Sequence, residues 1–82
     1  MSAHILLYTR KDCCLCDEMK AAIRDAAEGR SIGVEEVDVD SALELIEKYG
    51  SDVPVLFING RKAFKHRVTA KELKKRLRRE GL

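Results

Sequence analysis

The chain has 82 residues, enough for one hydrophobic core and too few for two, so we expect a single domain spanning residues 1–82. A hydrophobic content of 45% argues against a disordered chain, although 37% of the residues are charged. The apolar run at residues 5–8 is too short to cross a bilayer and is not preceded by the basic start of a secretory signal. We therefore expect a cytoplasmic protein whose thiols are kept reduced.

The first predicted elements are a strand, a helix and a second strand. Residues 5–9 form a continuous apolar stretch, which suits a central strand covered on both faces. Residues 13–27 place apolar side chains at spacings of three and four, which predicts an amphipathic helix that ends near Gly29. The apolar stripe of this helix is Leu15, Met19, Ala22, Ile23 and Ala26. Residues 34–39 mix valines with acids and predict a more exposed strand.

A second helix is predicted over residues 41–49. Either Asp40 or Ser41 would cap its N-terminus, and Gly50 would end it. The inner side of this helix would be marked by Leu43, Ile46 and Tyr49. Residues spaced by three positions lie on one face of a helix, so we expect these side chains to face the sheet together.

The last third of the chain predicts a hairpin and a final helix. The two strand-like runs are residues 53–58 and 61–65. Asn59 and Gly60 between them give a strong signal for a tight turn, because both turn positions need a positive φ angle. Thr69 and Glu72 form a capping box that would open the last helix. The buried face of that helix would carry Leu73 and Leu77.

This order of elements predicts the fold class. Helical crossovers favour parallel pairing of the first two strands, and the hairpin makes the last two antiparallel. The expected fold is therefore α/β, with the order βαβαββα and a four-stranded mixed sheet that has helices on both faces.

Three cysteines lie close together, at Cys13, Cys14 and Cys16. In a reducing compartment such a cluster indicates redox or metal chemistry rather than a structural framework. Cys13 would stand where the first helix begins, with Cys16 about one turn deeper on the same face, a spacing that permits a disulfide. Unpaired N–H groups and the helix dipole stabilise a thiolate at this end. We therefore expect Cys13 to be the nucleophile and Cys16 to resolve the mixed disulfide.

The neighbours of the dithiol have less specific roles. Arg10 and Lys11 precede the turn and favour a negative charge on sulfur, whereas Asp12 and Asp17 oppose it. Cys14 would point away from the dithiol, and we interpret it as a small buried apolar residue rather than a thiol open to modification.

A metal or iron–sulfur cluster is the first alternative use of the cysteines. They could supply thiolates, but a closed site needs four ligands and the sequence has no second cysteine pair. His4 and His66 are isolated, which is more typical of surface or strand residues than of ligands. A cluster shared between two chains would meet the ligand requirement, so this alternative stays open.

A non-catalytic interaction domain is the second alternative, because the C-terminal part of the chain is strongly basic. Residues 61–82 carry 10 Lys and Arg against 2 Asp and Glu, whereas residues 1–60 carry 6 against 12. We interpret the basic helix as a solvated face with cations near its C-terminus. It would otherwise dock a disulfide-bearing acidic protein, while the scarcity of aromatic residues argues against nucleic acid.

Two segments resemble motifs of a known family. They are Tyr8-Thr-Arg-Lys-Asp-Cys13-Cys-Leu-Cys16 and Ser51-Asp-Val-Pro-Val-Leu-Phe-Ile-Asn-Gly60, and they are similar to motifs of glutaredoxin-like proteins in the thioredoxin superfamily. The resemblance covers nearly the whole chain and is greatest to the short glutaredoxin-like proteins of bacteria. It implies a thioredoxin-like fold with a cis peptide bond before Pro54, which would face the dithiol. The backbone of Val53 would then pair with an extended substrate.

The chain departs from the dithiol glutaredoxins at two places. Its motif is Cys-Cys-Leu-Cys rather than Cys-Pro-Tyr-Cys, and the Gly-Gly pair expected after the fourth strand is missing. Phe64 and Lys65 stand about there, followed by His66 and Arg67, and side chains at that place would change the glutathione groove. The cations that would then hold a substrate carboxylate are Arg10, Lys11, Lys65 and Arg67.

We therefore predict a monomeric thiol–disulfide oxidoreductase that exchanges its Cys13–Cys16 dithiol with disulfides of proteins or of glutathione. Its predicted partners are a disulfide-containing protein or a glutathione mixed disulfide, and a cellular reductant that reopens the bond between the two cysteines. We expect no resident cofactor or metal, with glutathione acting at most as a co-substrate, and no nucleic acid or membrane as a partner.

Overall fold

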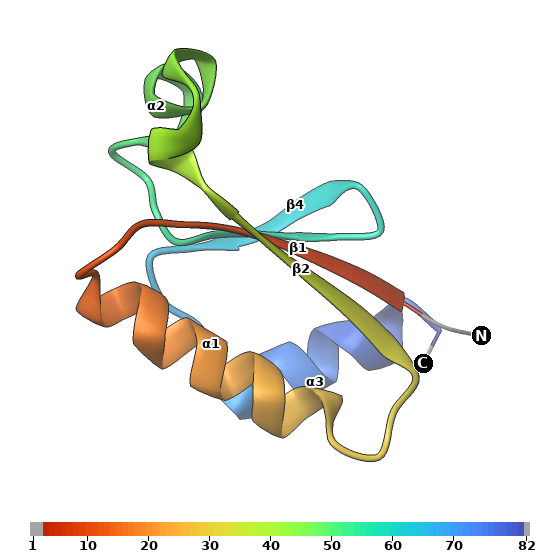
Figure 1. Cartoon of the computed structure of the whole chain (residues 1–82). Helices are drawn as coiled ribbons and strands as arrows, with labels where there is room; N and C mark the ends of the chain where they lie inside the picture. Colours follow the sequence, from red (N-terminus) through yellow and green to blue (C-terminus); the bar gives the residue numbers. More distant parts are fainter. Residues whose placement is uncertain (1–2, 82) are drawn as a thin grey trace.

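The computed structural model describes residues 3–81 (Figure 1). In chain order its elements are β1 (Ala3–Thr9), α1 (Cys14–Ala27), β2 (Ile32–Asp38), a short 3-10 helix η1 (Val39–Ser41), α2 (Leu43–Tyr49), β3 (Val55–Ile58), β4 (Arg61–Lys65) and α3 (Ala70–Arg79). Apart from η1, this is the order βαβαββα that the sequence predicts.

A single four-stranded sheet with the order β2-β1-β3-β4 organises these elements. β1 is parallel to β2 and antiparallel to β3, and β3 and β4 are antiparallel, so the predicted mixed pairing is confirmed. Tyr8, near the end of β1, stands opposite Val37 of β2 and Val55 of β3. The register therefore brings the ends of β1 and β2 and the start of β3 to the same end of the sheet. As expected of the more exposed strand, β2 lies at the edge and its side chains are half-buried or exposed.

The hydrophobic core lies between the sheet and the helices α1 and α3, which cover the same face (Figure 1). Every second residue of β1 is buried on this side, as the strand period requires. The core is almost entirely aliphatic, and its fully buried members include Ile5, Leu7, Met19, Leu56, Ile58, Leu73 and Leu77. This packing fixes the direction of α1 and therefore the place of its N-terminus.

On the opposite side of the sheet, α2 lies toward one end (Figure 1). A group of three aromatic side chains also lies there. The ring of Tyr49 at the end of α2 stacks on Tyr8 with centroids 4.3 Å apart, and Phe57 meets both rings edge to face. Helices therefore lie on both faces, as predicted. Coverage of β1 on this side is only partial, because Leu6 is half-buried and His4 is exposed.

The predicted inner side of α2 is wrong for two of its three residues. Leu43 is 78% exposed and Ile46 is 37% exposed, and no residue of α2 is buried. With only seven residues, α2 is too short to lay a continuous stripe on the sheet, and Tyr49 at its end makes the aromatic contact. Local spacing placed these residues on one face but could not show that this face has little to pack against.

The predicted cap of α2 is also wrong. The helix follows Ala42, whose side chain makes no capping hydrogen bond. Asp40 pairs with Arg10 instead, and the Ser41 hydroxyl donates to the backbone oxygen of Asp38 at 2.6 Å. The side chains of both candidate caps thus bind other partners, and both residues belong to η1, a helix that the sequence did not predict.

The other predicted turns are confirmed. The chain leaves α1 through Gly29 with φ 72°, and α2 ends at Gly50. Asn59 and Gly60 have φ angles of 50° and 83°, as the hairpin requires. The side chain of Asn59 also accepts a hydrogen bond from the backbone of His4 at 2.9 Å, which ties the hairpin to β1.

The last helix begins with the predicted capping box. The Thr69 hydroxyl accepts from the backbone of Glu72 at 3.1 Å, and the Glu72 carboxylate accepts from the backbone of Thr69 at 3.1 Å. Leu73 and Leu77 are fully buried, as predicted. No helix within residues 3–81 is long and apolar enough to span a membrane.

The contrast between buried and exposed leucines can be tested by truncation. Leu77→Ala should lower the free energy of unfolding by about 2–5 kcal/mol, because it leaves a cavity in the core. Leu43→Ala, made on the exposed face of α2, should change it by less than about 0.5 kcal/mol. Urea unfolding followed by circular dichroism measures both, and similar losses in the two variants would contradict the observed burial.

Tyr8 provides a test of pH dependence. Burial raises the pKa of Tyr8 above its ordinary value, and repulsion from Tyr49 and Glu35 raises it further. The unfolded chain therefore loses this proton at a lower pH than the folded protein does, so folding stability should fall as the pH rises above about 10. Urea midpoints between about pH 9 and pH 11 should fall more steeply in the native protein than in Tyr8→Phe; equal slopes would exclude this contribution.

Candidate active site

The candidate site lies where β1 passes into α1. β1 ends at Thr9, the chain turns through Asp12 with a φ angle of 55°, and Cys13 has an extended backbone at the N-cap of α1. The Cys13 sulfur accepts a hydrogen bond from the backbone N–H of Cys16, with 3.2 Å between nitrogen and sulfur. A sulfur atom therefore takes the place that a hydroxyl or carboxylate oxygen usually takes at a helix N-cap.

Cys13 and Cys16 are joined in a disulfide, with their Cα atoms 5.2 Å apart. Cys13 is half-buried, whereas Cys16 is completely buried on the inner side of α1. The two sulfurs thus differ in accessibility: the first can meet a molecule from solvent, and the second can be reached through the first. This is the arrangement that the spacing of the two cysteines predicts.

Cys14 differs from its prediction. It is an exposed free cysteine, not a small buried apolar residue. It occupies the first position of α1, directly after the N-cap, and its neighbour Cys16 takes the inward position. The prediction that Cys14 points away from the dithiol is compatible with this, but the expected burial is wrong because no element covers the outer side of this first turn.

A cis peptide bond joins Val53 to Pro54, as the family resemblance implies. Since Tyr8 stands opposite Val55, the preceding Pro54 lies beside the end of β1, at the end of the sheet where α1 begins. Pro54 is buried, and Val53 is half-buried. Within residues 3–81 the backbone of Val53 takes part in no hydrogen bond, so its polar groups are free.

His66 occupies a special backbone position directly after β4. Its φ angle is 67°, in the region that glycine adopts most easily, and its backbone N–H donates to the Pro54 oxygen at 2.8 Å. Its Nε2 lies 4.0 Å from the carboxylate of Asp52, and Lys65 Nζ lies 3.8 Å from the same carboxylate. The sequence shows that the expected glycines are missing here. It does not show that this loop is hydrogen-bonded to the proline turn.

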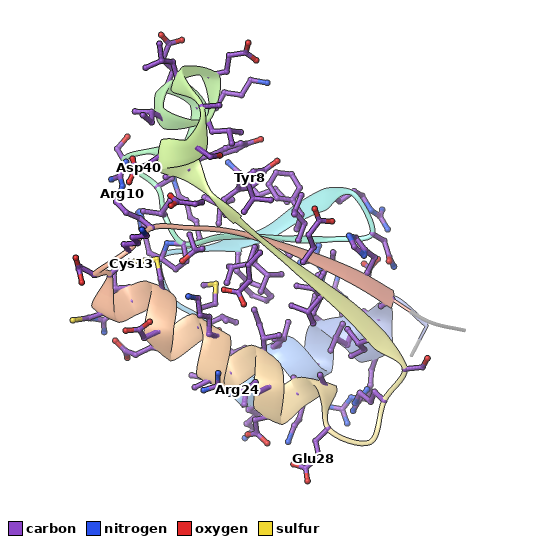
Figure 2. All side chains as sticks on the ribbon, viewed as in Figure 1. Tyr8, Arg10, Cys13, Arg24, Glu28 and Asp40 are labelled. Atoms are coloured by element: carbon purple, nitrogen blue, oxygen red, sulfur yellow. A yellow bond between two sulfur atoms is a disulfide. The ribbon has the colours of Figure 1, made fainter. Side chains whose placement is uncertain are left out.

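Arg10 and Lys11, the two predicted substrate-binding cations, are placed differently. The guanidinium of Arg10 donates to the Asp40 carboxylate and to the backbone oxygen of Gly50, so each of its three nitrogens has a partner. Lys11 is exposed. Figure 2 shows Arg10 and Asp40 at the same end of the molecule as Cys13. Binding of substrate by Lys11 stays a prediction, whereas Arg10 already has protein partners.

The described residues offer little support for a metal site. Within residues 3–81 no group of three or more His, Cys, Asp or Glu side chains could hold a metal ion. His4 lies 3.6 Å from Glu35, and His66 faces Asp52, so each histidine meets a single acid. A site shared between two chains is not tested by this geometry.

The basic helix α3 is partly neutralised by its neighbours. Lys74 lies 3.6 Å from Asp25 of α1, and Arg76 lies 3.6 Å from Glu80 and 6.0 Å from the centre of the Phe64 ring. The cations of this helix that are exposed are Lys71, Lys75, Arg78 and Arg79. This arrangement fits a solvated helix face, and a docking role for it stays a prediction.

A CxxC disulfide at the start of a helix, together with a cis proline at the end of a mixed βαβαββα sheet, defines a thioredoxin-like protein. The fold is shared with a thioredoxin from Halobacterium salinarum, which superposes with a TM-score of 0.67 over 94% of this chain and 73% of that chain at 21% identity. The predicted thioredoxin-like fold is therefore confirmed.

The chain belongs to the family described as "Glutaredoxin-like domain (DUF836)", which it matches over residues 4–78. It is 33% identical over an alignment of 78 residues to "Glutaredoxin-like protein YDR286C homolog" from Dictyostelium discoideum, and the match covers 88% of this chain and 72% of that protein. The X-ray structure of protein XcR50 from X. campestris has a TM-score of 0.79 and 33% identity, covering 92% of this chain and 96% of that one. The family resemblance inferred from the two motifs is confirmed.

The thiol content of the protein tests the pairing. The chain has three cysteines, of which two form the disulfide. In denaturant, which exposes the buried Cys16, the oxidised protein should therefore have one reactive thiol and the reduced protein three. Cys14→Ser should abolish the reactive thiol of the oxidised form, and titration with a chromogenic disulfide reagent measures it. A reactive thiol that persists in oxidised Cys14→Ser would contradict the pairing of Cys13 with Cys16.

Proposed function

We propose that the protein is a thiol–disulfide oxidoreductase that reduces disulfides through Cys13 and Cys16. The reduced Cys13 thiolate attacks one sulfur of a substrate disulfide, the substrate S–S bond breaks, and the other substrate sulfur leaves as a thiolate that takes up a proton. Cys16, as a thiolate, then attacks the Cys13 sulfur, releases the second substrate thiol and closes the Cys13–Cys16 bond. Two electrons pass to the substrate, and a cellular thiol reductant returns them to the protein.

The observation that carries this proposal is the backbone N–H of Cys16 directed at the Cys13 sulfur. A helix N-terminus offers amide groups that lack a partner within the helix, together with the positive end of the helix dipole. Both stabilise a negative sulfur more than a neutral one, and the thiolate is the reactive form. The complete burial of Cys16 supports its role as the resolving cysteine, because it reserves that sulfur for the intramolecular step.

The substrate would lie against the proline turn. The free backbone of Val53 can pair with an extended segment on either side of a substrate disulfide, as an added strand does. This supports protein disulfides as substrates. A groove of about 330 Å³ between α1 and the start of α3 is lined by Arg67 together with the acids Glu18 and Glu72. Arg67 is the cation in this groove for a glutathione carboxylate. The proposed substrates are therefore protein disulfides and glutathione mixed disulfides.

A reductase assay tests the function and separates the substrates. With an external reductant present, the native protein should reduce both insulin disulfides and a mixed disulfide of glutathione with a small thiol. Cys13→Ser should lower either rate by at least about a hundredfold, because it removes the nucleophile. Cys14→Ser is the matched control, since it exchanges a neighbouring exposed thiol, and it should retain the native rate.

Cys16→Ser distinguishes the two substrate classes. Insulin reduction should be lost in this variant, because no second thiol releases the substrate, whereas reduction of the glutathione mixed disulfide should persist if glutathione itself can resolve the intermediate. Normal insulin reduction by Cys13→Ser would refute the enzyme proposal and favour the non-catalytic interaction domain.

A further inference from the structure

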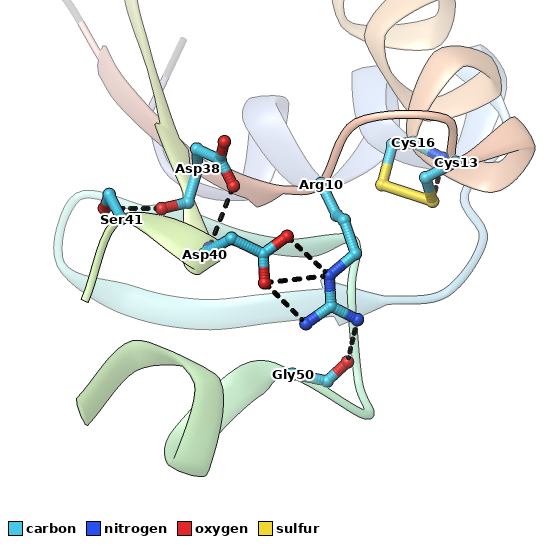
Figure 3. A network of polar contacts seen from close by, with 7 residues as sticks. All are labelled: Arg10, Cys13, Cys16, Asp38, Asp40, Ser41 and Gly50. Carbon is cyan, nitrogen blue, oxygen red and sulfur yellow. Dashed lines mark hydrogen bonds and ion pairs between the residues drawn. A yellow bond between two sulfur atoms is a disulfide. The ribbon is translucent and has the colours of Figure 1, made fainter. Parts of the chain in front are cut away.

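Arg10 connects three segments of the chain at the end of the sheet (Figure 3). Its Nε and one terminal nitrogen donate to the Asp40 carboxylate at 3.1 Å, and the other terminal nitrogen donates to the Gly50 backbone oxygen at 3.0 Å. Arg10 follows directly on β1, Asp40 belongs to η1, and Gly50 ends α2. One side chain therefore links the end of β1 to both ends of the η1–α2 segment.

These contacts lie close to both halves of the proposed site. Arg10 is three residues before Cys13, and Gly50 is three residues before Val53. The loop that carries the nucleophile and the loop that carries the proline turn are thus joined by a single guanidinium group. On the far side, the His66 N–H donates to the Pro54 oxygen, so the proline turn is held from two directions.

Within the segment that Arg10 holds, Val39 of η1 is fully buried, but α2 has few attachments to the rest of the protein. No residue of α2 is buried, and the aromatic stack of Tyr49 is its main contact with the sheet. The Gly50 carbonyl is part-buried, so the Arg10 contact replaces water that it would otherwise bind. Pro54 itself is buried, so packing fixes the end of the turn. The loop before it, residues 50–53, is held by Arg10 at Gly50 and by the longer contacts of Asp52 with Lys65 and His66, at 3.8 Å and 4.0 Å.

Charge alone does not explain this arrangement. The ion pair of Arg10 with Asp40 leaves the two side chains 34% and 47% exposed, and pairs this exposed add little to the free energy of folding. The planar guanidinium, however, can donate hydrogen bonds to the Asp40 carboxylate and the Gly50 carbonyl at the same time. A lysine ammonium on its flexible stem does this poorly. The distinctive effect of Arg10 is thus geometric.

We propose that Arg10 is a positioning residue that holds the loop of residues 50–53, which leads into Pro54, in place relative to the Cys13 loop. This inference rests on the proposed function, because it concerns how the substrate is held for exchange. Arg10 contacts neither the substrate nor the reacting sulfurs; it acts through Asp40 and Gly50. Displacing the turn would weaken the pairing of its backbone with substrate. Such a loss of binding, equal in the ground state and the transition state, raises KM and leaves kcat unchanged.

The experiment compares Arg10→Met, Arg10→Lys and Asp40→Asn with Lys20→Met as a matched control. Lys20 also forms an ion pair, with Glu36 at 3.1 Å, and the two side chains are 31% and 50% exposed, but this pair joins α1 to β2 away from the site. Arg10→Met should raise the KM for insulin disulfides about tenfold and leave kcat within about twofold, because binding is misaligned while the dithiol is intact. Lys20→Met should change neither.

The other variants separate positioning from direct binding of substrate. Arg10→Lys and Asp40→Asn should each raise the KM for insulin disulfides, but by less than Arg10→Met does. Combining Arg10→Met with Asp40→Asn should be no worse than Arg10→Met alone, since both remove the same contact. Two results would overturn the proposal in favour of a direct charge contact with substrate. One is a native KM in Arg10→Lys, and the other is a native KM in Asp40→Asn when the KM of Arg10→Met is raised.

Two readouts keep this result separate from the proposed function. The pH profile of Cys13 alkylation by iodoacetamide should be the same in Arg10→Met and the native protein; a shifted profile would mean that the Arg10 charge acts on the sulfur. Hydrogen exchange of the backbone amides of residues 50–53 should be faster in Arg10→Met and unchanged in Lys20→Met. Native exchange in Arg10→Met overturns the positioning role, whereas a native protein inactive on every disulfide refutes only the enzyme proposal.

Discussion

The need to satisfy the free amide groups at the start of α1 shapes the site more than any other constraint. Helix N-termini leave backbone N–H groups without a partner inside the helix, and here the Cys13 sulfur accepts one of them from Cys16. The position of this helix end follows from the core, since α1 packs its buried face on the central strand β1. A structural requirement of the helix thus gives the sulfur the surroundings that favour its anionic form.

The second part of the site is held by hydrogen bonds as well as by the burial of Pro54. The turn before β3 receives a donor from the His66 backbone at Pro54, and the loop before it receives the Arg10 guanidinium at Gly50. Connecting segments cannot bury much apolar surface, so polar contacts of this kind determine where they lie. The backbone of Val53 is left free between them, which is the condition for pairing with an extended ligand.

The charge imbalance along the chain is moderated by the fold. The acidic first part and the basic last part meet across element boundaries, for example where Lys74 approaches Asp25 and Lys65 approaches Asp52. These pairs are exposed, so each contributes little to stability. Their consequence is that the basic helix presents fewer uncompensated charges than its composition indicates, and its exposed cations lie mainly along its outer face.

The sequence by itself determined the order of the strands and α-helices, the hairpin, the capping box of α3 and the pairing of the two cysteines. These depend on local chemistry: helical spacing, turn residues with positive φ angles such as Gly60, and two thiols one helical turn apart. Only the tertiary structure decided the exposure of Leu43 and Cys14 and the role of Arg10. Exposure depends on whether another element covers a face, and the partners of a long polar side chain depend on which distant segments lie within its reach; neither is encoded in local spacing.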